Sequence, residues 1–423
     1  MTFQNSLSFA RTMDQADPLR PFRQRFFIPK VNGREAIYLC GNSLGLQPKT
    51  VIDELKTELN DWKNLGVEGH LHATRPWLYY HHFFAQSLSK LVGAKPSEVV
   101  AMNQLSVNLN LMLISFYRPK GKRTKVLMQA NEFPSDYYAV EQQMRLHGID
   151  PKKNLLEVLP RQGEVTLRTE DIIAQIKTHR QELALVLFSA VNYYTGQLFD
   201  LKKIAAACCE HGIIFGVDLA HAIGNVELKL HDWNIDFATW CSYKYLNSGP
   251  GGVSGVFVHQ YHAKNQTLPR LAGWWGNAEK TRFKMPKHFV PQEGAAGWQL
   301  SNAPVLSMAA HRASLNIFDA AGMKAIRQKS MLLTGYLQWL LQEQPAAKKG
   351  VDVRIITPAD PAQRGAQLSL QTGKNGKKLF ERLTQQGVIA DWREPDVIRV
   401  APAPLYNSFE EVWRFAQILQ QQV

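Results

Sequence analysis

Residues 241–252 read Cys241-Ser-Tyr-Lys244-Tyr-Leu-Asn-Ser-Gly-Pro-Gly-Gly252, and they follow the apolar run Phe237-Ala-Thr-Trp240. The apolar run is typical of a buried strand, and the glycines and proline end regular structure. A lysine at the end of a buried strand must pair its charge, reach solvent or lose its proton. A desolvated lysine becomes an amine nucleophile that can form a Schiff base. Lys244 is therefore either a catalytic amine or a strand-end lysine that reaches the surface.

A second apolar run ends in an acid. Residues 213–218, Ile-Ile-Phe-Gly-Val-Asp218, predict another buried strand, and His221 follows. Because ligands of open α/β sheets bind at the carboxyl ends of strands, we expect Asp218 and Lys244 to border the same crevice. This pair suits pyridoxal phosphate (PLP), whose aldehyde is held by a lysine and whose pyridinium nitrogen is held by an acid. The alternative for Asp218 is a helix N-cap.

Alternation of strands and helices over residues 98–260 indicates the fold class. It predicts an α/β protein with a mainly parallel sheet and helices on both faces. Neither a G-x-G-x-x-G motif after a strand nor a P-loop is present, which argues against a dinucleotide site or an NTPase. The predicted strands are residues 99–102, 125–128, 183–188, 213–218, 237–240 and 253–259, and the predicted helices include 107–116 and 200–211.

The character of the sequence changes after residue 305. A long helical stretch is expected from Leu306 towards Gln344, with an interruption at Pro345–Gly350. Short strands and a helix follow, and a capping box at Ser408 opens the last helix. These patterns predict a smaller α+β domain. The predicted division is an N-terminal segment that joins the small domain (1–45), a large PLP-binding domain (46–305) and a C-terminal small domain (306–423).

Composition restricts the class of protein. The 423 residues are 45% hydrophobic and 20% charged, which is typical of a globular protein. The net charge of +13 favours anionic ligands, but the basic residues are scattered, so nucleic acid is not an expected partner. Four cysteines without a C-x-x-C pair indicate neither a zinc site nor a disulfide framework, and no metal is assigned. Without a signal pattern or a membrane-span run, a cytoplasmic protein is expected.

Three further features have two readings each. Ser106 stands at the expected start of helix 107–116, where it can cap the helix or help to bind a phosphate. Phe133 follows a strand and can stack on a flat ring or pack in the core. His70, in a glycine- and proline-bounded stretch, can contact a substrate or belong to a solvated loop.

Separate motifs then occur in an order that resembles the kynureninase family. The resemblance extends from Asn42-Ser-Leu-Gly45 to Arg399-Val-Ala-Pro402, nearly the whole chain. It implies the PLP-dependent transferase fold type I (aspartate-aminotransferase fold, class V aminotransferase group) and a homodimer with shared active sites. The other motifs are Phe133-Pro-Ser-Asp136, Tyr193-Tyr-Thr-Gly196, Val217-Asp-Leu-Ala-His221, Ser242-Tyr-Lys-Tyr-Leu-Asn247 and Gly273-Trp-Trp-Gly276.

The resemblance also implies roles for single residues. Lys244 would hold the cofactor, Asp218 would pair with its ring nitrogen, and Tyr243 would donate a proton. Arg399 would bind the substrate α-carboxylate, for which a guanidinium is well suited. Leu105, Ser106 and Tyr243 would hold the phosphate, Trp274 and Asn302 would reach it from the neighbouring subunit, Phe133 would stack on the ring, Asp136, Ser189 and His221 would line the cofactor, and His70, Ser301 and Asn302 would meet the aromatic end of the substrate.

The reaction that the resemblance implies is hydrolysis of the Cβ–Cγ bond of L-kynurenine or 3-hydroxy-L-kynurenine, giving an anthranilate and L-alanine. The pathway would be tryptophan breakdown or NAD synthesis. The polar set His70, Ser301 and Asn302 predicts good use of the hydroxylated substrate. A class V cysteine desulfurase, with Cys40 as its candidate nucleophile, a class V aminotransferase and a non-catalytic binding protein are the alternatives. The presence of Lys244, Asp218 and Arg399 argues against a non-catalytic binding protein.

Overall fold

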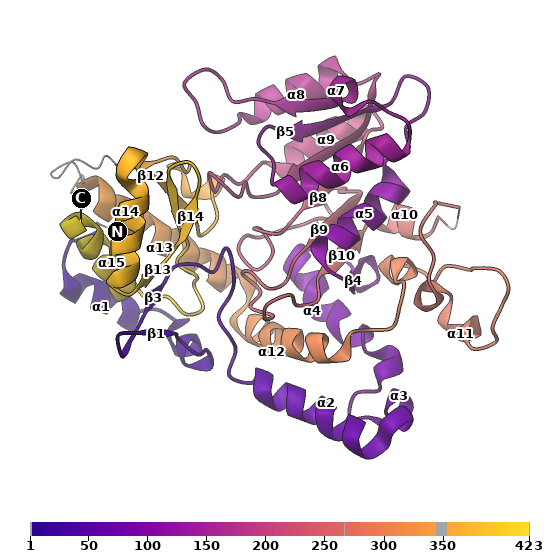
Figure 1. Ribbon diagram of the computed structural model, residues 1–423, viewed down its shortest axis with the longest axis horizontal. Helices are drawn as coiled ribbons and strands as arrows, with labels where there is room; N and C mark the ends of the chain where they lie inside the picture. The colour runs from indigo at the N-terminus through magenta and orange to yellow at the C-terminus, as the bar shows by residue number, and fades with distance from the viewer. Residues whose placement is uncertain (1, 266, 344–352, 423) are drawn as a thin grey trace.

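A seven-stranded sheet forms the centre of the larger part of the molecule in the computed structural model, which describes residues 2–265, 267–343 and 353–422 (Figure 1). β10 is antiparallel to both of its neighbours, and the other pairings are parallel. The predicted α/β class with a mainly parallel sheet is confirmed. β6 was not predicted. In spatial order the strands are β4 (Val99–Ala101), β10 (Gly255–Val258), β9 (Phe237–Trp240), β8 (Ile214–Asp218), β7 (Leu183–Ser189), β5 (Lys125–Gln129) and β6 (Leu155–Val158).

The central strands are apolar throughout because both faces of the sheet are buried. Successive side chains point to opposite faces, so Val217 enters one apolar core while Phe237 and Val126 enter the other. α4 (His82–Val92), α8 (Thr169–Thr178) and α9 (Leu201–Glu210) supply the first core, and α5 (Leu105–Phe116) and α6 (Pro134–Leu146) supply the second. The sheet is thereby fixed in place, with its carboxyl ends open.

The helical stretch after residue 305 consists of two helices rather than one. α12 (Val305–Ala321) packs on α2 (Val51–Leu65), and α13 (Met323–Glu343) follows. Gly322 separates them because its φ of +75° is left-handed, and its N–H closes the last turn of α12 on Phe318 O at 2.8 Å. The expectation of one helix from Leu306 was wrong at this point. The predicted interruption at Pro345–Gly350 lies outside the described residues.

A four-stranded antiparallel sheet forms the smaller part. Its order is β11 (Arg354–Ile355), β12 (Leu368–Gln371), β15 (Val397–Val400) and β14 (Asp391–Arg393). Apolar residues of this sheet pack with α13, α14 (Gly376–Gln385) and α15 (Phe409–Gln422) in one core. The predicted capping box is confirmed, since Glu411 N–H donates to Ser408 Oγ at 3.1 Å and Ser408 N–H to Glu411 Oε2 at 3.0 Å.

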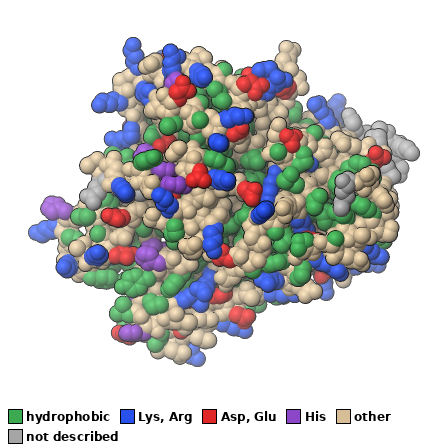
Figure 2. All heavy atoms as spheres, turned by 180° about the vertical axis from the view of Figure 1, so that it is seen from behind, with side chains coloured by type: hydrophobic (Ala, Val, Ile, Leu, Met, Phe, Trp, Pro, Cys, Tyr) green, Lys and Arg blue, Asp and Glu red, His purple; other side chains and the backbone are tan. Residues whose placement is uncertain are grey.

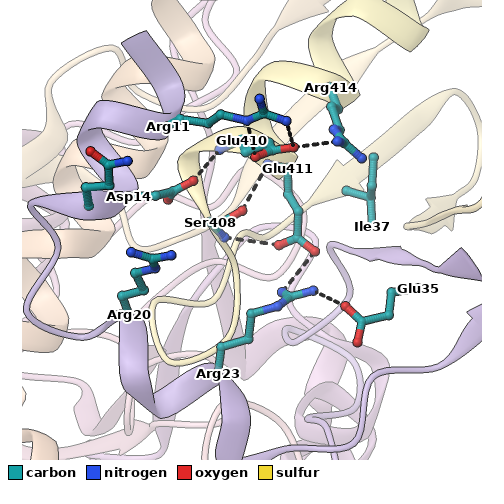
Figure 3. Close-up of a pocket in the computed structure, with 11 residues that line it drawn as sticks. Arg11, Asp14, Arg20, Arg23, Glu35, Ile37, Ser408, Glu410, Glu411 and Arg414 are labelled. Atoms are coloured by element: carbon teal, nitrogen blue, oxygen red, sulfur yellow. Dashed lines mark hydrogen bonds and ion pairs between the residues drawn. The ribbon is translucent and has the colours of Figure 1, made fainter. Parts of the chain in front are cut away.

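The N-terminal segment packs on this smaller part. β3 (Ile37–Tyr38) pairs in parallel with β13 (Val388–Ile389), and α1 (Leu7–Gln15) packs on α15. Figure 3 shows ion pairs where these elements meet, with Arg11 and Arg414 directed at Glu410 and Arg23 at Glu411. The domain boundaries at residues 45 and 305 stay predictions. The remaining short elements are β1 (Lys30–Val31), β2 (Arg34–Glu35), α3 (Gly69–His72), α7 (Pro151–Asn154), α10 (Gln260–Ala263) and α11 (Glu279–Arg282).

The surface carries no concentrated basic region on the face that Figure 2 shows, where lysine and arginine side chains are spread over the molecule. This distribution agrees with the scattered charges of the sequence. Among the helices of the described residues, none combines the length and apolar character that a membrane crossing requires.

Candidate active site

The carboxyl ends of the parallel strands border a cavity of about 150 Å³. Asp218 ends β8, Ser189 ends β7, and Lys244 follows β9. Asp218 and Lys244 therefore share one crevice, as the strand-end argument expected. The cavity is lined by Gln104, Leu105, Ser106, Phe133, Ser135, Ser189, Tyr193, Asp218, Ala220, His221, Tyr243 and Lys244.

Lys244 and His221 contact each other at this cavity. Lys244 Nζ lies 3.0 Å from His221 Nε2 and 5.8 Å from the centre of the Phe133 ring. Burial and the positive charge of Lys244 lower the pKa of His221 well below its usual range, so the ring is neutral. Nε2 then accepts from the Lys244 ammonium, and Nδ1 carries the proton. Nδ1 is buried and has no partner among the described residues, so it is a donor available to a ligand.

Three buried acids face the same region. Burial raises the pKa of Asp218 to about 7, although the charge of Lys244 opposes this rise. Burial and the charges of Asp218 and Glu132 raise the pKa of Asp136 well above its usual range. Asp218 Oδ1 accepts from Ala220 N–H at 2.7 Å, while neither Asp136 oxygen has a partner in the described chain. The carboxyl groups of Asp218 and Asp136 are therefore underpaired, which suits a ligand that brings positive charge or N–H groups.

The hydrogen bond from Ala220 N–H to Asp218 also tests the alternative prediction that Asp218 is a helix N-cap. Residues 219–226 form turns rather than a described helix, so the carboxylate caps a turn with one oxygen. The other oxygen remains for a ligand.

Glu132 is a site residue that the sequence analysis did not single out. Its carboxylate accepts from Phe133 N–H at 2.7 Å, from Ser189 Oγ at 2.6 Å and from Ser189 N–H at 3.3 Å. Glu132 thereby ties the loop after β5 to the end of β7. The only feature of the sequence that could have indicated Glu132 was its position directly before Phe133, because its partner Ser189 lies far away in the chain.

Phe133 lies against the cavity and not in either core. It is half-buried, and the Tyr193 ring meets it edge to face at a centre distance of 5.3 Å. Of its two readings, the geometry supports the one in which the Phe133 face can receive a flat ring. Tyr193 was quoted only as part of a motif, and it lines the cavity as well.

The start of α5 forms the polar end of the cavity. Its N-cap is Gln104, so the expectation that Ser106 is the N-cap was wrong, because the helix begins two residues earlier. Ser106 Oγ lies 2.6 Å from Ser135 Oγ. The first hydrogen bond of the helix runs from Asn108 N–H to Gln104 O. The backbone N–H groups of the first turn come before Asn108 and therefore have no acceptor within the helix. Two hydroxyls and a helix start suit a phosphate.

Tyr243 lines the cavity next to Lys244. Burial raises the pKa of Tyr243, so its hydroxyl keeps its proton at neutral pH. Gly45 N–H donates to Tyr243 O at 2.8 Å, and a Cβ on Gly45 would stand 2.3 Å from Lys244 O. The Asn42–Gly45 loop therefore lies directly against the lysine loop, and only glycine allows this approach.

Arg399 is fully buried in β15 and already has a carboxylate partner. Its Nε and Nη2 lie 3.1 and 2.8 Å from the two oxygens of Asp391, and its Nη1 donates to Tyr193 O at 2.7 Å. Asp391 stands directly opposite Arg399 in the β14–β15 register. Two of the five guanidinium N–H groups, one on each terminal nitrogen, remain for another ligand.

Six predicted site residues are not among those that line this cavity; Asp136 and Arg399, described above, are two of them, and the other four lie apart from it. His70 and Asn302 line a second cavity of about 160 Å³, together with Trp77 and Leu306, and Ser301 is exposed beside Asn302. Trp274 begins a short 3-10 turn, is 46% exposed and packs edge-on against Phe283. Within one chain, the structure does not bring these four residues to Lys244.

Cys40 does not have the character of a nucleophile. It is partly exposed, and burial together with the charge of Asp391 raises the pKa of its thiol to about 12. The thiolate is therefore scarce at neutral pH. This argues against a desulfurase that uses Cys40.

Solved structures share this fold. A cystine C–S lyase mutant with glycine linked to its PLP cofactor aligns with 16% identity and a TM-score of 0.76, over 91% of this chain and 96% of that one. A cysteine desulfurase of Escherichia coli aligns with 16% identity and a TM-score of 0.75, over 96% and 98%. The fold is that of PLP-dependent enzymes of fold type I, as predicted.

Curated relatives identify the family. The kynureninase of Myxococcus xanthus is 54% identical over 99% of this chain and 97% of its own length, and that of Xanthomonas campestris is 52% identical over 97% and 96%. The kynureninase of Nematostella vectensis is 48% identical over 98% and 93%. A profile of the kynureninase C-terminal domain matches residues 326–419. The chain belongs to the kynureninase family.

Proposed function

We propose that this protein is a PLP-dependent kynureninase that hydrolyses the Cβ–Cγ bond of L-kynurenine, 3-hydroxy-L-kynurenine or both. The observation that carries the proposal is the meeting of Lys244, His221 and Asp218 at one cavity in a chain of this family. The products are an anthranilate and L-alanine. The role is in tryptophan breakdown or NAD synthesis, in the cytoplasm.

The residues present fit PLP. Lys244 Nζ would hold the aldehyde carbon, and Asp218 would pair with the ring nitrogen, which would supply the positive charge that the buried carboxyl lacks. Phe133 would cover the ring, Ser189 and His221 would line it, and His221 Nδ1 would gain an acceptor. Ser106, Ser135 and the start of α5 would hold the phosphate, with Leu105 and Tyr243 beside them.

The residues of the chain then supply binding and proton transfer. When bound, PLP draws electrons from the substrate α-carbon. Arg399 binds the α-carboxylate with its two remaining N–H groups, while Asp391 holds the guanidinium in place. Once the substrate amine has replaced Lys244 at the aldehyde carbon, the freed Lys244 Nζ would remove the Cα proton, and neutral His221 accepts a hydrogen bond from this amine. Water adds to the γ-carbonyl, the Cβ–Cγ bond breaks with its electron pair on Cβ, and Tyr243 Oη would give a proton to Cβ. Each such proton transfer contributes about 10²–10⁴ in rate.

The first experiment tests cofactor and activity together. The purified protein, loaded with PLP, is treated with borohydride, and peptides are mapped by mass spectrometry. We expect a pyridoxyl adduct on Lys244 and release of anthranilate from L-kynurenine. Lys244→Ala should abolish both, whereas Lys203→Ala, at an exposed helix position, should retain both. An adduct on Lys244 without release of an anthranilate or alanine from either substrate would contradict the proposed reaction.

We also propose a homodimer in which Trp274, His70, Ser301 and Asn302 complete the site of the partner subunit. Exposed apolar side chains support an interface near the second cavity: Trp62 is 60% exposed and Leu71 is 54% exposed. Figure 2 shows hydrophobic side chains gathered on the lower part of the molecule, where α2 and α3 lie. Monomers rarely leave a large apolar patch uncovered.

Mixing two defective variants tests the shared site. Lys244→Ala and Trp274→Ala are each expected to be poorly active. After subunit exchange, a mixed dimer contains one site with both native halves, so activity should rise above the sum of the two. A mixture that never exceeds this sum, with dimers present by light scattering, would contradict sharing of Trp274.

The polar residues of the second cavity support good use of the hydroxylated substrate. His70 and Asn302 can hydrogen-bond a ring hydroxyl, and a site built for a hydroxyl discriminates against the analogue without it. We expect kcat/KM to be higher for 3-hydroxy-L-kynurenine. A clear preference for L-kynurenine would contradict this assignment.

A further inference from the structure

Two histidines at the start of α4 converge on one carboxylate oxygen of α11. His81 Nε2 lies 3.4 Å and His82 Nε2 lies 2.8 Å from Glu279 Oε1. The three ligand atoms lie within 4.8 Å of one another. None of these residues lines the Lys244 cavity or takes part in the proposed reaction.

His81 is a buried side chain with few polar contacts. It is 4% exposed; Nδ1 has no partner among the described residues, and Nε2 has only the 3.4 Å contact with Glu279 Oε1. The imidazole of His81 therefore offers a ring nitrogen that no hydrogen bond to another described residue occupies. Neutral imidazole and ionised carboxylate are the forms that bind a metal.

Two of the three separations are close to those of a zinc site, and the third, between the two histidines, is at most 4.8 Å. With bonds of about 2.1 Å and tetrahedral angles, neighbouring ligand atoms stand about 3.4 Å apart. His81 and Glu279 already have this separation, at 3.4 Å. His82 must move out by about 0.6 Å from its 2.8 Å contact, which its 49% exposed side chain can do.

A second cluster of the same composition lacks these properties. Glu98 already accepts from Lys95 N–H at 2.8 Å, Gln260 N–H at 2.9 Å and His231 Nδ1 at 2.9 Å. The rings of His231 and His259 are stacked with an interplanar angle of 3°. Since imidazole lone pairs lie in the ring planes, rings stacked face to face with centres 4.9 Å apart cannot both point at one ion, whereas the His81 and His82 rings, with centres 4.1 Å apart, are tilted by 33°. The Glu98 carboxylate is therefore satisfied by its donors, and the stacked rings share no metal position, although His259 Nε2 has no partner among the described residues.

We propose that His81, His82 and Glu279 form a binding site for a divalent transition-metal ion of the zinc class, with water as the fourth ligand. The site joins α4 to the segment that carries Trp274, five residues before Glu279. A bound ion therefore fastens this segment to the main body. Arg282 is the nearby cation that opposes the ion, and it is held on Trp275, with its carbon 4.5 Å above the ring.

The probe is Co²⁺ added to the full-length, PLP-loaded protein in a Cys209→Ser background, because Cys209 is an exposed thiol that can bind metal on its own. We expect one Co²⁺ per chain with the strong visible absorption of a tetrahedral site, displaced by Zn²⁺. His82→Gln and Glu279→Gln should each weaken binding at least tenfold. Both positions are partly exposed, and near-ultraviolet circular dichroism checks that the variants fold.

His72→Gln is the matched control, since His72 and Glu68 form an exposed His–Glu pair at 3.7 Å without a second histidine. Its binding should equal that of the parent. Two outcomes overturn the proposal: no saturable Co²⁺ binding, or binding that Glu279→Gln leaves unchanged in a folded protein.

Discussion

Asp218 is expected to lower the stability of the cofactor-free protein, and Asp218→Asn should reveal the size of this effect. The carboxyl is 6% exposed, and burial raises its pKa to about 7. In an unfolded chain the pKa is about 3.9. The folded protein therefore binds this proton more tightly than the unfolded chain does.

The sign of the pH effect follows from this difference. Below about pH 4 the Asp218 carboxyl is protonated in both the folded and the unfolded state, so it does not change the free energy of unfolding. Between about pH 4 and 7 the unfolded chain releases the proton more easily, so stability falls as pH rises, and the loss is complete above pH 7. A pKa difference of about 3 corresponds to about 4 kcal/mol at the alkaline end. Asparagine keeps the oxygen that accepts from Ala220 N–H and removes the charge.

The assay is urea unfolding of the cofactor-free protein at pH 5, 6.5 and 8. The free-energy difference between Asp218→Asn and the parent should shift in favour of the variant by about 2–3 kcal/mol from pH 5 to pH 8. Asp232→Asn, at an exposed position, should show no such change. A difference that stays constant within about 0.5 kcal/mol would refute the burial argument. With PLP added the variant should become less stable than the parent, because it lacks the proposed carboxylate partner of the ring nitrogen.

Other substitutions test the remaining contacts. Arg399→Lys should raise KM at least about 30-fold in steady-state kinetics, because losing a bidentate contact with the substrate carboxylate costs about 2 kcal/mol or more. A KM within threefold of that of the parent would contradict the assignment. Glu132→Gln replaces the carboxylate that accepts from Phe133 N–H and Ser189 Oγ by an amide, so the free energy of unfolding in urea should fall by about 1–3 kcal/mol. An unchanged unfolding midpoint would mean that the carboxylate is dispensable for stability. Gly45→Ala would bring a methyl group to 2.3 Å from Lys244 O, so kcat/KM should fall at least about tenfold. Gly335→Ala, whose nearest atom stands at 3.8 Å, should retain full activity, and loss in both variants would point to a general effect.

Local patterns predicted the strand ends well. The runs before Asp218 and Lys244 are apolar without alternation because both faces of their strands are buried, and the polar residue that follows marks the open edge of the sheet. The reversed direction of β10 could not be predicted in this way, since hydrophobic periodicity is the same in both directions. The break at Gly322 was hidden because apolar residues continue on both sides of it.

The contacts that tune the site were the least predictable. Asp391 and Arg399 are eight residues apart, yet they meet only because β14 and β15 form a hairpin in one register. Glu132, just after β5, contacts Ser189 at the end of the neighbouring strand β7, and nothing near either residue in the sequence indicates the other. Contacts of this kind depend on the fold as a whole, so a single sequence can indicate one residue of such a pair but not its partner.

The pairing of β3 with β13 ties residues 37–38 to residues 388–389, and it therefore sets an order of events during synthesis. At about 5–20 residues per second, the ribosome needs roughly 20–70 s to make the intervening chain of about 350 residues. During that time the apolar side of α1 and the edge of β3 have no permanent neighbour. A prematurely terminated chain would keep both uncovered, so a chaperone or protease can distinguish it from the finished protein by its first 40 residues.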